Sequence, residues 1–159
     1  MGFLASCWFD ALSPIVRSAL LAFLLGGCAG FPRDQNGTTA RIRESGILSV
    51  GASSSDTAPT ALEEREEQLV DRVAAQLGAR AVWRRGNTHE LLEALEEQKL
   101  ALVAATVPCD SPFAERVAMS QPYRLDEPRH QEYCLAVAPG ENELLLLVDH
   151  IIADMKEPR

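Results

Sequence analysis

The feature that most constrains the fold is an alternation between short apolar runs and segments with helical periodicity. Apolar residues recur at helical spacing from Leu62 to Leu77, and a second amphipathic segment begins after Asn87, with Glu90 at the spacing of a capping box. Three apolar runs typical of buried strands flank these helices: 47–53, 79–84 and 100–106. Strands and helices that alternate with short connections favour right-handed crossovers. The order therefore predicts a parallel, three-layer α/β sheet.

The second half of the chain predicts a strand that returns to this sheet and a long terminal helix. After an irregular loop come three further elements: a short edge segment at 117–123, a strand at 133–138 and a largely buried helix at 143–156. A single helical turn is expected at 41–45, before the first strand. These elements make one folded domain over 41–157.

Composition and motifs argue against nucleic-acid binding and against catalysis. The chain of 159 residues carries a formal net charge of −8, whereas phosphate recognition needs a basic face. It has no glycine-rich phosphate loop and no nucleophile elbow, and its histidines have no partners at metal-ligand spacing: His89, His130 and His150. We therefore expect neither enzyme activity nor a cofactor or bound metal.

The amino-terminal segment has the pattern of a secretory signal. Its apolar run, 18–27, follows Arg17, ends in small residues and is shorter than the about 20 residues that cross a bilayer. The letters LGGC at its end resemble the lipobox of bacterial lipoproteins, in which the signal is removed and the cysteine carries lipid. The resemblance implies a signal at 1–27, lipidation of Cys28 and a flexible tether over 28–40. An ordinary cleaved signal and a buried helix are the alternatives.

The lipoprotein resemblance also implies a location in the cell envelope, facing the periplasm. In Gram-negative lipoproteins an Asp after the lipidated cysteine tends to mean inner-membrane retention, and Ala29 here slightly favours the outer membrane. Cys7 leaves with the signal and Cys28 is acylated. Cys109 and Cys134 then remain as an even pair in an oxidising compartment.

Four glutamates crowd the first turns of the helix that begins near Leu62: Glu63, Glu64, Glu66 and Glu67. Such a cluster is a candidate metal or catalytic site. However, a helix dipole favours anions at its amino terminus, and solvent stabilises them there. We expect this simpler explanation to hold and the glutamates to be solvated.

The order of the segments resembles the bacterial solute-binding protein family 3, the periplasmic receptors of amino-acid-type ABC importers. The similar stretches are ILSVGAS, EREEQLVDRVAAQLGA, THELLEALEEQKLALVAAT and SQPY, and the tail EYCLAVAPGENELLLLVDHIIADM is similar to the last strand and helix of some members. The resemblance implies a fold equivalent to one lobe of a type II periplasmic binding protein. In such a lobe the sheet is mostly parallel, with one antiparallel returning strand.

Two features depart from the family. Only residues 124–132 separate SQPY from the returning strand, so the chain has no room there for the family's second lobe. The family usually has an Arg seven residues before the Ser of this motif, where it grips the ligand's α-carboxylate. That position is Phe113 here, and Arg116 is three residues out of register, so we do not assign it the role.

The resemblance also places a ligand crevice beyond the carboxyl ends of the first and third strands. The candidate ligand-binding residues in the loops there are Ser53, Ser55, Asp56, Thr106, Asp110, Ser111 and Phe113. Their hydroxyls, backbone amides and aromatic ring can hold a small polar solute. Alternatively, Ser, Asp and Pro only build turns. The same strand order brings Cys134 beside Cys109 and implies a disulfide.

These observations lead to one functional hypothesis and two alternatives. The hypothesis is a lipid-anchored, non-catalytic domain of the cell envelope that binds a small polar solute for transport or sensing, with an ABC transporter or another envelope protein as partner. The first alternative is an interaction module that docks a protein partner or a second copy through the face that the second lobe covers in the family. The second is a remnant that binds no ligand.

Overall fold

The structure is a computed structural model and describes residues 33–54, 60–123 and 132–156. The expected signal, Cys28, Ser55, Asp56 and His130 lie outside these ranges. Along the chain the elements are α2 (Thr38–Ser45), β1 (Ile47–Ser53), α3 (Ala61–Gln76), β2 (Arg80–Gly86), α4 (Thr88–Glu96), β3 (Leu102–Pro108), the 3₁₀ turn η2 (Pro112–Glu115), β4 (Ala118–Met119), β5 (Tyr133–Val137) and α5 (Asn142–Lys156). In the described part of the chain no helix is both long and apolar enough to span a membrane.

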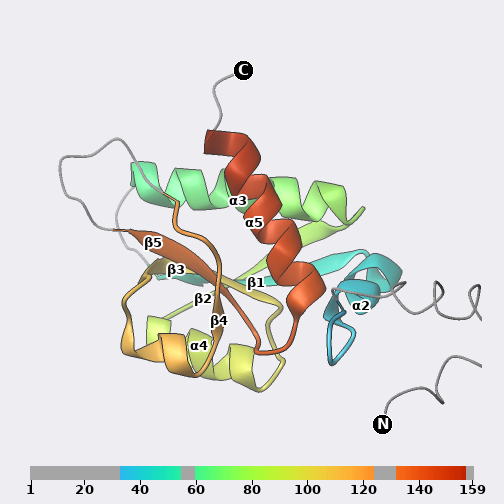
Figure 1. The fold of residues 1–159 in the computed structure, drawn as a ribbon, viewed down its shortest axis with the longest axis horizontal. Helices are drawn as coiled ribbons and strands as arrows, with labels where there is room; N and C mark the ends of the chain where they lie inside the picture. The colour runs from blue at the N-terminus through green and yellow to red at the C-terminus, as the bar shows by residue number, and fades with distance from the viewer. Residues whose placement is uncertain (1–32, 55–59, 124–131, 157–159) are drawn as a thin grey trace, which may run out of the picture. The chain divides into compact units, whose positions relative to one another are not determined.

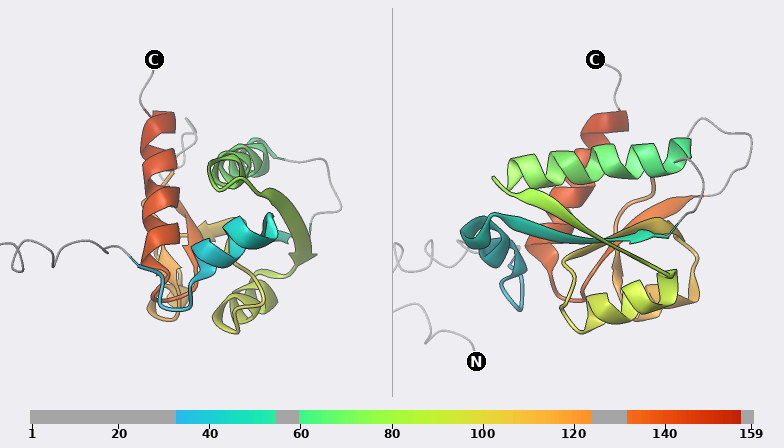
Figure 2. Two further views of the ribbon diagram at one scale, coloured as in Figure 1. Left: turned by 90° about the vertical axis from the view of Figure 1, so that its right-hand side faces the viewer. Right: turned by 180° about the vertical axis from the view of Figure 1, so that it is seen from behind.

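The five strands form one mixed sheet in the order β2-β1-β3-β5-β4. β1 pairs in parallel with β2 on one side and with β3 on the other, whereas β5 runs antiparallel to β3 and β4. Helices α3 and α5 cover one face and α4 covers the other, as Figures 1 and 2 show. The predicted fold class, one lobe with a mostly parallel sheet and one returning strand, is confirmed.

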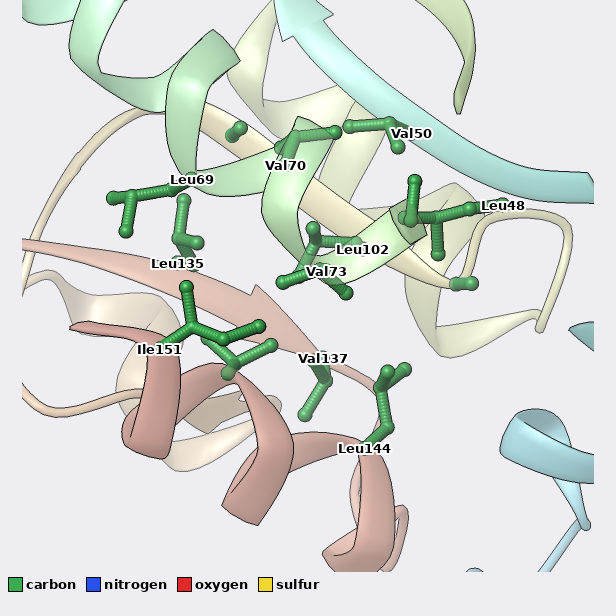
Figure 3. Packing of buried hydrophobic residues seen from close by; sticks show 14 of the residues in the cluster. Leu48, Val50, Leu69, Val70, Val73, Leu102, Leu135, Val137, Leu144 and Ile151 are labelled. Atoms are coloured by element: carbon green, nitrogen blue, oxygen red, sulfur yellow. The ribbon is translucent and has the colours of Figure 1, made fainter. Parts of the chain in front are cut away.

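The larger core lies between the sheet and the pair α3 and α5. Figure 3 shows Leu69, Val70 and Val73 of α3 packed toward Leu135 on the sheet and Leu144 of α5. All five side chains are at most 1% exposed. Burying a side chain of this size contributes about 1.5–3 kcal/mol relative to its exposed state. The periodicity that predicted α3 therefore reflects its buried face.

The second core lies under α4 on the opposite face of the sheet. Leu91, Leu92 and Leu95 pack there against Val103 and Val107 of β3. Gly51 of β1 allows this close approach, because a Cβ at that position would lie 2.9 Å from Leu100 Cδ1 and 3.0 Å from Leu91 Cδ2. Each crossover helix thus covers its own face of the sheet.

The expected tether over 28–40 is wrong for its last part, because α2 begins at Thr38 and the residues before it bind α5. Asp34 Oδ1 accepts hydrogen bonds from the backbone N–H groups of Glu143 (2.7 Å) and Leu144 (3.1 Å). In return, Glu141 accepts from the backbone N–H groups of Asn36 (3.0 Å) and Thr38 (3.1 Å). These reciprocal caps satisfy the open N–H groups at the starts of both helices. We call Asp34, Asn36 and Glu141 the N-terminal clasp.

Candidate functional site

The carboxyl ends of β1 and β3 lie side by side at the point where the chain reverses its direction across the sheet. From β1 the chain crosses one face through α3 to β2, and from β2 it crosses the other face through α4 to β3. Such a switch point is the usual ligand position in open α/β sheets. We call Ser53, Thr106 and the loop 109–113 the switch-point site.

Ser53 links the end of β1 to β3 by a side-chain hydrogen bond. Its hydroxyl donates a hydrogen bond to the carbonyl oxygen of Ala105, at 3.1 Å. Its own carbonyl oxygen accepts one from Nη1 of Arg85, at 3.4 Å. Arg85 is exposed at the end of β2, so its guanidinium group brings a positive charge to the rim of the site.

Thr106 lies in an irregularity of β3. The pairing with β5 shifts register between Val103 and Val107, as in a β-bulge, and Thr106 has φ 54°. A β-branched residue rarely adopts this conformation. The Thr106 N–H points back toward α3 and donates to Glu66 Oε1 at 2.7 Å.

The expectation that the four glutamates of α3 are solvated is wrong for Glu66. Its side chain is buried, at 3% exposure, and accepts a hydrogen bond from the hydroxyl of Tyr123 as well as from Thr106. Burial raises the pKa of Glu66 to about 7, although the bonds from Tyr123 and Thr106 oppose the increase. Burial also raises the pKa of the Tyr123 phenol. Glu66 follows Leu62 and precedes Leu69 and Val70 at helical spacing, a signal that could have placed it on the buried face.

The other glutamates of the cluster agree with the helix-terminus interpretation. Thr60 caps α3 and forms a capping box with Glu63, in which the Thr60 N–H donates to Glu63 Oε2 at 2.6 Å. Glu64 and Glu67 are exposed. Among the described residues no three His, Cys, Asp or Glu side chains converge as a metal site.

The loop 109–113 is fixed at both ends. Cys109 forms the expected disulfide with Cys134, across a Cα–Cα distance of 5.1 Å. Ser111 Oγ accepts from the Phe113 N–H at 3.4 Å and caps η2. The Phe113 ring is half-buried against the second core and lies 5.6 Å from the ring of His89, between centroids. Its outer part and the exposed Asp110 remain open to solvent.

The SQPY segment ties three elements together and thereby supports the switch-point site. Ser120 Oγ accepts from the N–H of Leu135 in β5 at 2.9 Å, and the N–H of Gln121 donates to Asp149 of α5 at 2.6 Å. Tyr123 reaches Glu66 of α3, as described above. In this chain the motif therefore has a structural role.

The structure thus brings together Ser53 and Thr106 on adjacent strands and places Asp110, Ser111 and Phe113 in the adjoining loop. Sequence reasoning missed Arg85 and Glu66.

Arg116 forms an ion pair with Glu96 at 2.9 Å and does not reach this site. The two described histidines are exposed and each pairs with a carboxylate one turn on, His89 with Glu93 and His150 with Asp154.

Comparisons with solved structures reveal similar folds at low sequence identity. A point mutant of the arginine-bound domain 1 of TmArgBP has a TM-score of 0.64 at 20% identity, over 74% of this chain and 98% of that one. The arginine-bound form of the same domain without that mutation scores 0.61 at 20% identity, over 72% and 97%. An amino acid ABC transporter substrate-binding protein from Streptococcus pneumoniae, bound to L-arginine, scores 0.62 at 13% identity, over 75% and 92%.

Another similar structure is an ancestral amino acid-binding protein described as a precursor of cyclohexadienyl dehydratase. Its TM-score is 0.62 at 14% identity, over 75% of this chain and 93% of that one. No family model matches the chain, and no curated protein matches it. At these identities the comparisons establish the fold, that of a single domain of amino-acid-binding proteins.

Proposed function

We propose that the chain is a lipid-anchored, non-catalytic solute receptor of the cell envelope, which binds a small polar solute at the switch-point site. The observation that carries the proposal is the pairing of β1 and β3, which brings Ser53 and Thr106 together at the carboxyl ends of these two strands. A related fold, domain 1 of TmArgBP, is arginine-bound as a single domain. One lobe is therefore sufficient to hold an amino acid in a protein of this fold.

The described residues supply three kinds of interaction for such a solute. Ser111 has a hydroxyl that can donate, the outer part of the Phe113 ring offers an apolar face, and Arg85 offers a cation for an anionic group. Arg85 thereby compensates for Phe113 at the position of the family's arginine. Ser55 and Asp56, which follow β1, remain proposed ligand contacts.

The envelope location is supported by the Cys109–Cys134 disulfide, because disulfides persist mainly in oxidising compartments. Lipidation of Cys28 rests on the lipobox-like LGGC and attaches the domain to a membrane, for which Ala29 slightly favours the outer one. An ABC transporter or another envelope protein would receive the solute or the signal.

A thermal-shift screen of residues 32–159, which form one compact unit, tests the proposal. In oxidising buffer, a ligand at 100 times its Kd stabilises by about 2.7 kcal/mol and raises Tm by several degrees. The screen uses L-arginine, other amino acids and small polar metabolites. For an anionic hit, Arg85→Ala should abolish the shift, and the matched control Arg116→Ala, which removes an exposed arginine elsewhere, should retain it. A flat screen on the folded domain would contradict solute reception for these compounds.

The alternative interaction module gains little support from the described surface. The large apolar side chains with the greatest exposure are Ile47, Val82 and Leu146, none of which belongs to the switch-point site. A dimer in gel filtration together with a flat screen would favour the module. A monomer with a flat screen would favour a remnant without ligand.

A further inference from the structure

We propose that one end of the sheet faces the lipid bilayer and that the switch-point site faces away from it. The membrane-facing end, which we call the amino pole, consists of α2, the first residues of β1 and the turn 97–101 before β3. The inference rests on the lipid anchor at Cys28 that is part of the proposed function.

The N-terminal clasp holds the chain at the amino pole. Asp34 and Glu141 bind residues 34–38 to the start of α5, through the hydrogen bonds given above. Helix α5 follows β5, whose last residue, Val137, pairs with Leu102 at the beginning of β3. The switch-point site lies at the other end of β3. Figures 1 and 2 show α2 beyond the start of β1, at the same end of the sheet as the clasp.

The length of chain between the clasp and the anchor limits how the domain can turn. Four residues, 29–32, separate Cys28 from Arg33, and a fully extended chain gains at most about 3.5 Å per residue, or about 18 Å over this stretch. A tether that continued to residue 40 would reach about 45 Å by the same rule and would let any face approach the bilayer. The clasp therefore keeps the amino pole next to the lipid.

The surface of the amino pole suits contact with phospholipid headgroups. It has a groove of about 280 Å³ whose lining includes Arg41, Ile42 and Ile47. Ile47 is 39% exposed, and Arg41 is exposed beside it. An exposed arginine can donate hydrogen bonds to lipid phosphates, and an apolar side chain can enter the interface.

The opposite end of the sheet is less suited to a bilayer with anionic lipids. Helix α3 begins there, and Glu63, Glu64 and Glu67 lie in its first two turns. Carboxylates are repelled by an anionic surface within a Debye length of about 8–10 Å. The amino pole itself has Glu44 and Glu97, but Arg41, Arg43 and Lys99 outnumber them, whereas Arg85 at the opposite end stands beside three glutamates. The balance of charge and the tether length thus favour the same orientation.

The two lysines of the chain provide a direct test, because they lie toward opposite ends. Lys99 is in the turn 97–101 of the amino pole, and its side chain is 62% exposed. Lys156 is at the end of α5, and its Nζ lies 3.4 Å from Oε1 of Gln121. Gln121 comes two residues before Tyr123, which forms a β-bridge with Tyr133 near the switch-point site.

The full chain, processed in a bacterium and reconstituted in liposomes, is labelled with an amine-reactive donor dye. Energy transfer to acceptor-labelled headgroups is then compared in Lys156→Arg and Lys99→Arg.

A dye on Lys99 should lie about 20 Å closer to the bilayer, the length of a seven-residue strand, so its transfer efficiency should be at least about twofold greater. The double lysine variant gives the background, and a Gly/Ser insertion between Phe31 and Pro32 should remove the difference. Equal transfer from both sites, or greater transfer from Lys156, would overturn the inference. Liposome retention of the wild-type chain but not of Cys28→Ala tests the anchor separately. If the anchor is absent, the proposed orientation fails with it, by a result distinct from a reversed orientation.

Discussion

Replacing the buried Glu66 by glutamine should change how the stability of the domain depends on pH. In the folded protein the pKa of Glu66 is raised from 4.5 to about 7, chiefly by burial. Between these two values the folded state keeps a proton that the unfolded state releases. The free energy of unfolding therefore falls as the pH rises through this window, and the contribution is fully favourable only below pH 4.5.

The size of the effect follows from the shift. At about 1.4 kcal/mol per pKa unit the full penalty is about 3 kcal/mol, of which about 2–3 kcal/mol develops between pH 5 and pH 8. Glutamine has nearly the same shape, and its Oε1 can accept from the Thr106 N–H and the Tyr123 hydroxyl as Glu66 Oε1 does. It does not titrate, so its contribution is constant.

Urea unfolding of both proteins at pH 5 and pH 8 measures the difference. The free energy of unfolding of Glu66→Gln relative to wild type should increase by about 2–3 kcal/mol from pH 5 to pH 8. Glu67→Gln, which neutralises an exposed glutamate next to it in sequence, is the control and should follow the wild-type profile. Parallel profiles for wild type and Glu66→Gln would refute the assignment of a raised pKa to this carboxyl.

Three further predictions concern the contacts around the site and the clasp. Tyr123→Phe removes a hydrogen bond that lowers the pKa of Glu66, so the pH-dependent loss of stability should move to higher pH and the free energy of unfolding should fall by about 1–2 kcal/mol; an unchanged pH profile would be inconsistent with this contact. Reduction of the disulfide, which links residues 25 apart, should cost about 3.5 kcal/mol by the loop-entropy estimate and lower Tm, which calorimetry with and without reductant can detect. Asp34→Ala leaves the first N–H groups of α5 without their cap and should cost about 1–2 kcal/mol, against no more than about 0.5 kcal/mol for the exposed control Asp110→Ala.

The alternating part of the fold was predictable because its signals are local. Helix α3 combines apolar periodicity from Leu62 to Val73 with a cap at Thr60, and the runs of β1 and β3 are continuous and apolar. Each of these patterns lies within one element. The strand order then followed from the resemblance to a known family and from the crossover rule.

The features that sequence reasoning missed depend on contacts between distant residues. Asp34 and Glu143 lie 109 residues apart, so a segment that reads as a polar tether becomes a helix cap only when α5 is in place. Glu66 reads as one of a solvated cluster, and its burial depends on Tyr123, 57 residues away. The positive φ of Thr106 could not be expected from a β-branched residue in an apolar run.

A heteronuclear NMR titration of the ¹⁵N-labelled domain, residues 32–159, tests the central claim most directly. The ligand is L-arginine first and then any compound that raises Tm in the screen. Binding at the switch-point site predicts saturable shifts of the amide signals of Ser53, Thr106 and Ser111, with little change in α2. Shifts confined to other surfaces, or no shifts at millimolar ligand with any compound, would contradict the account of a single-lobe solute receptor.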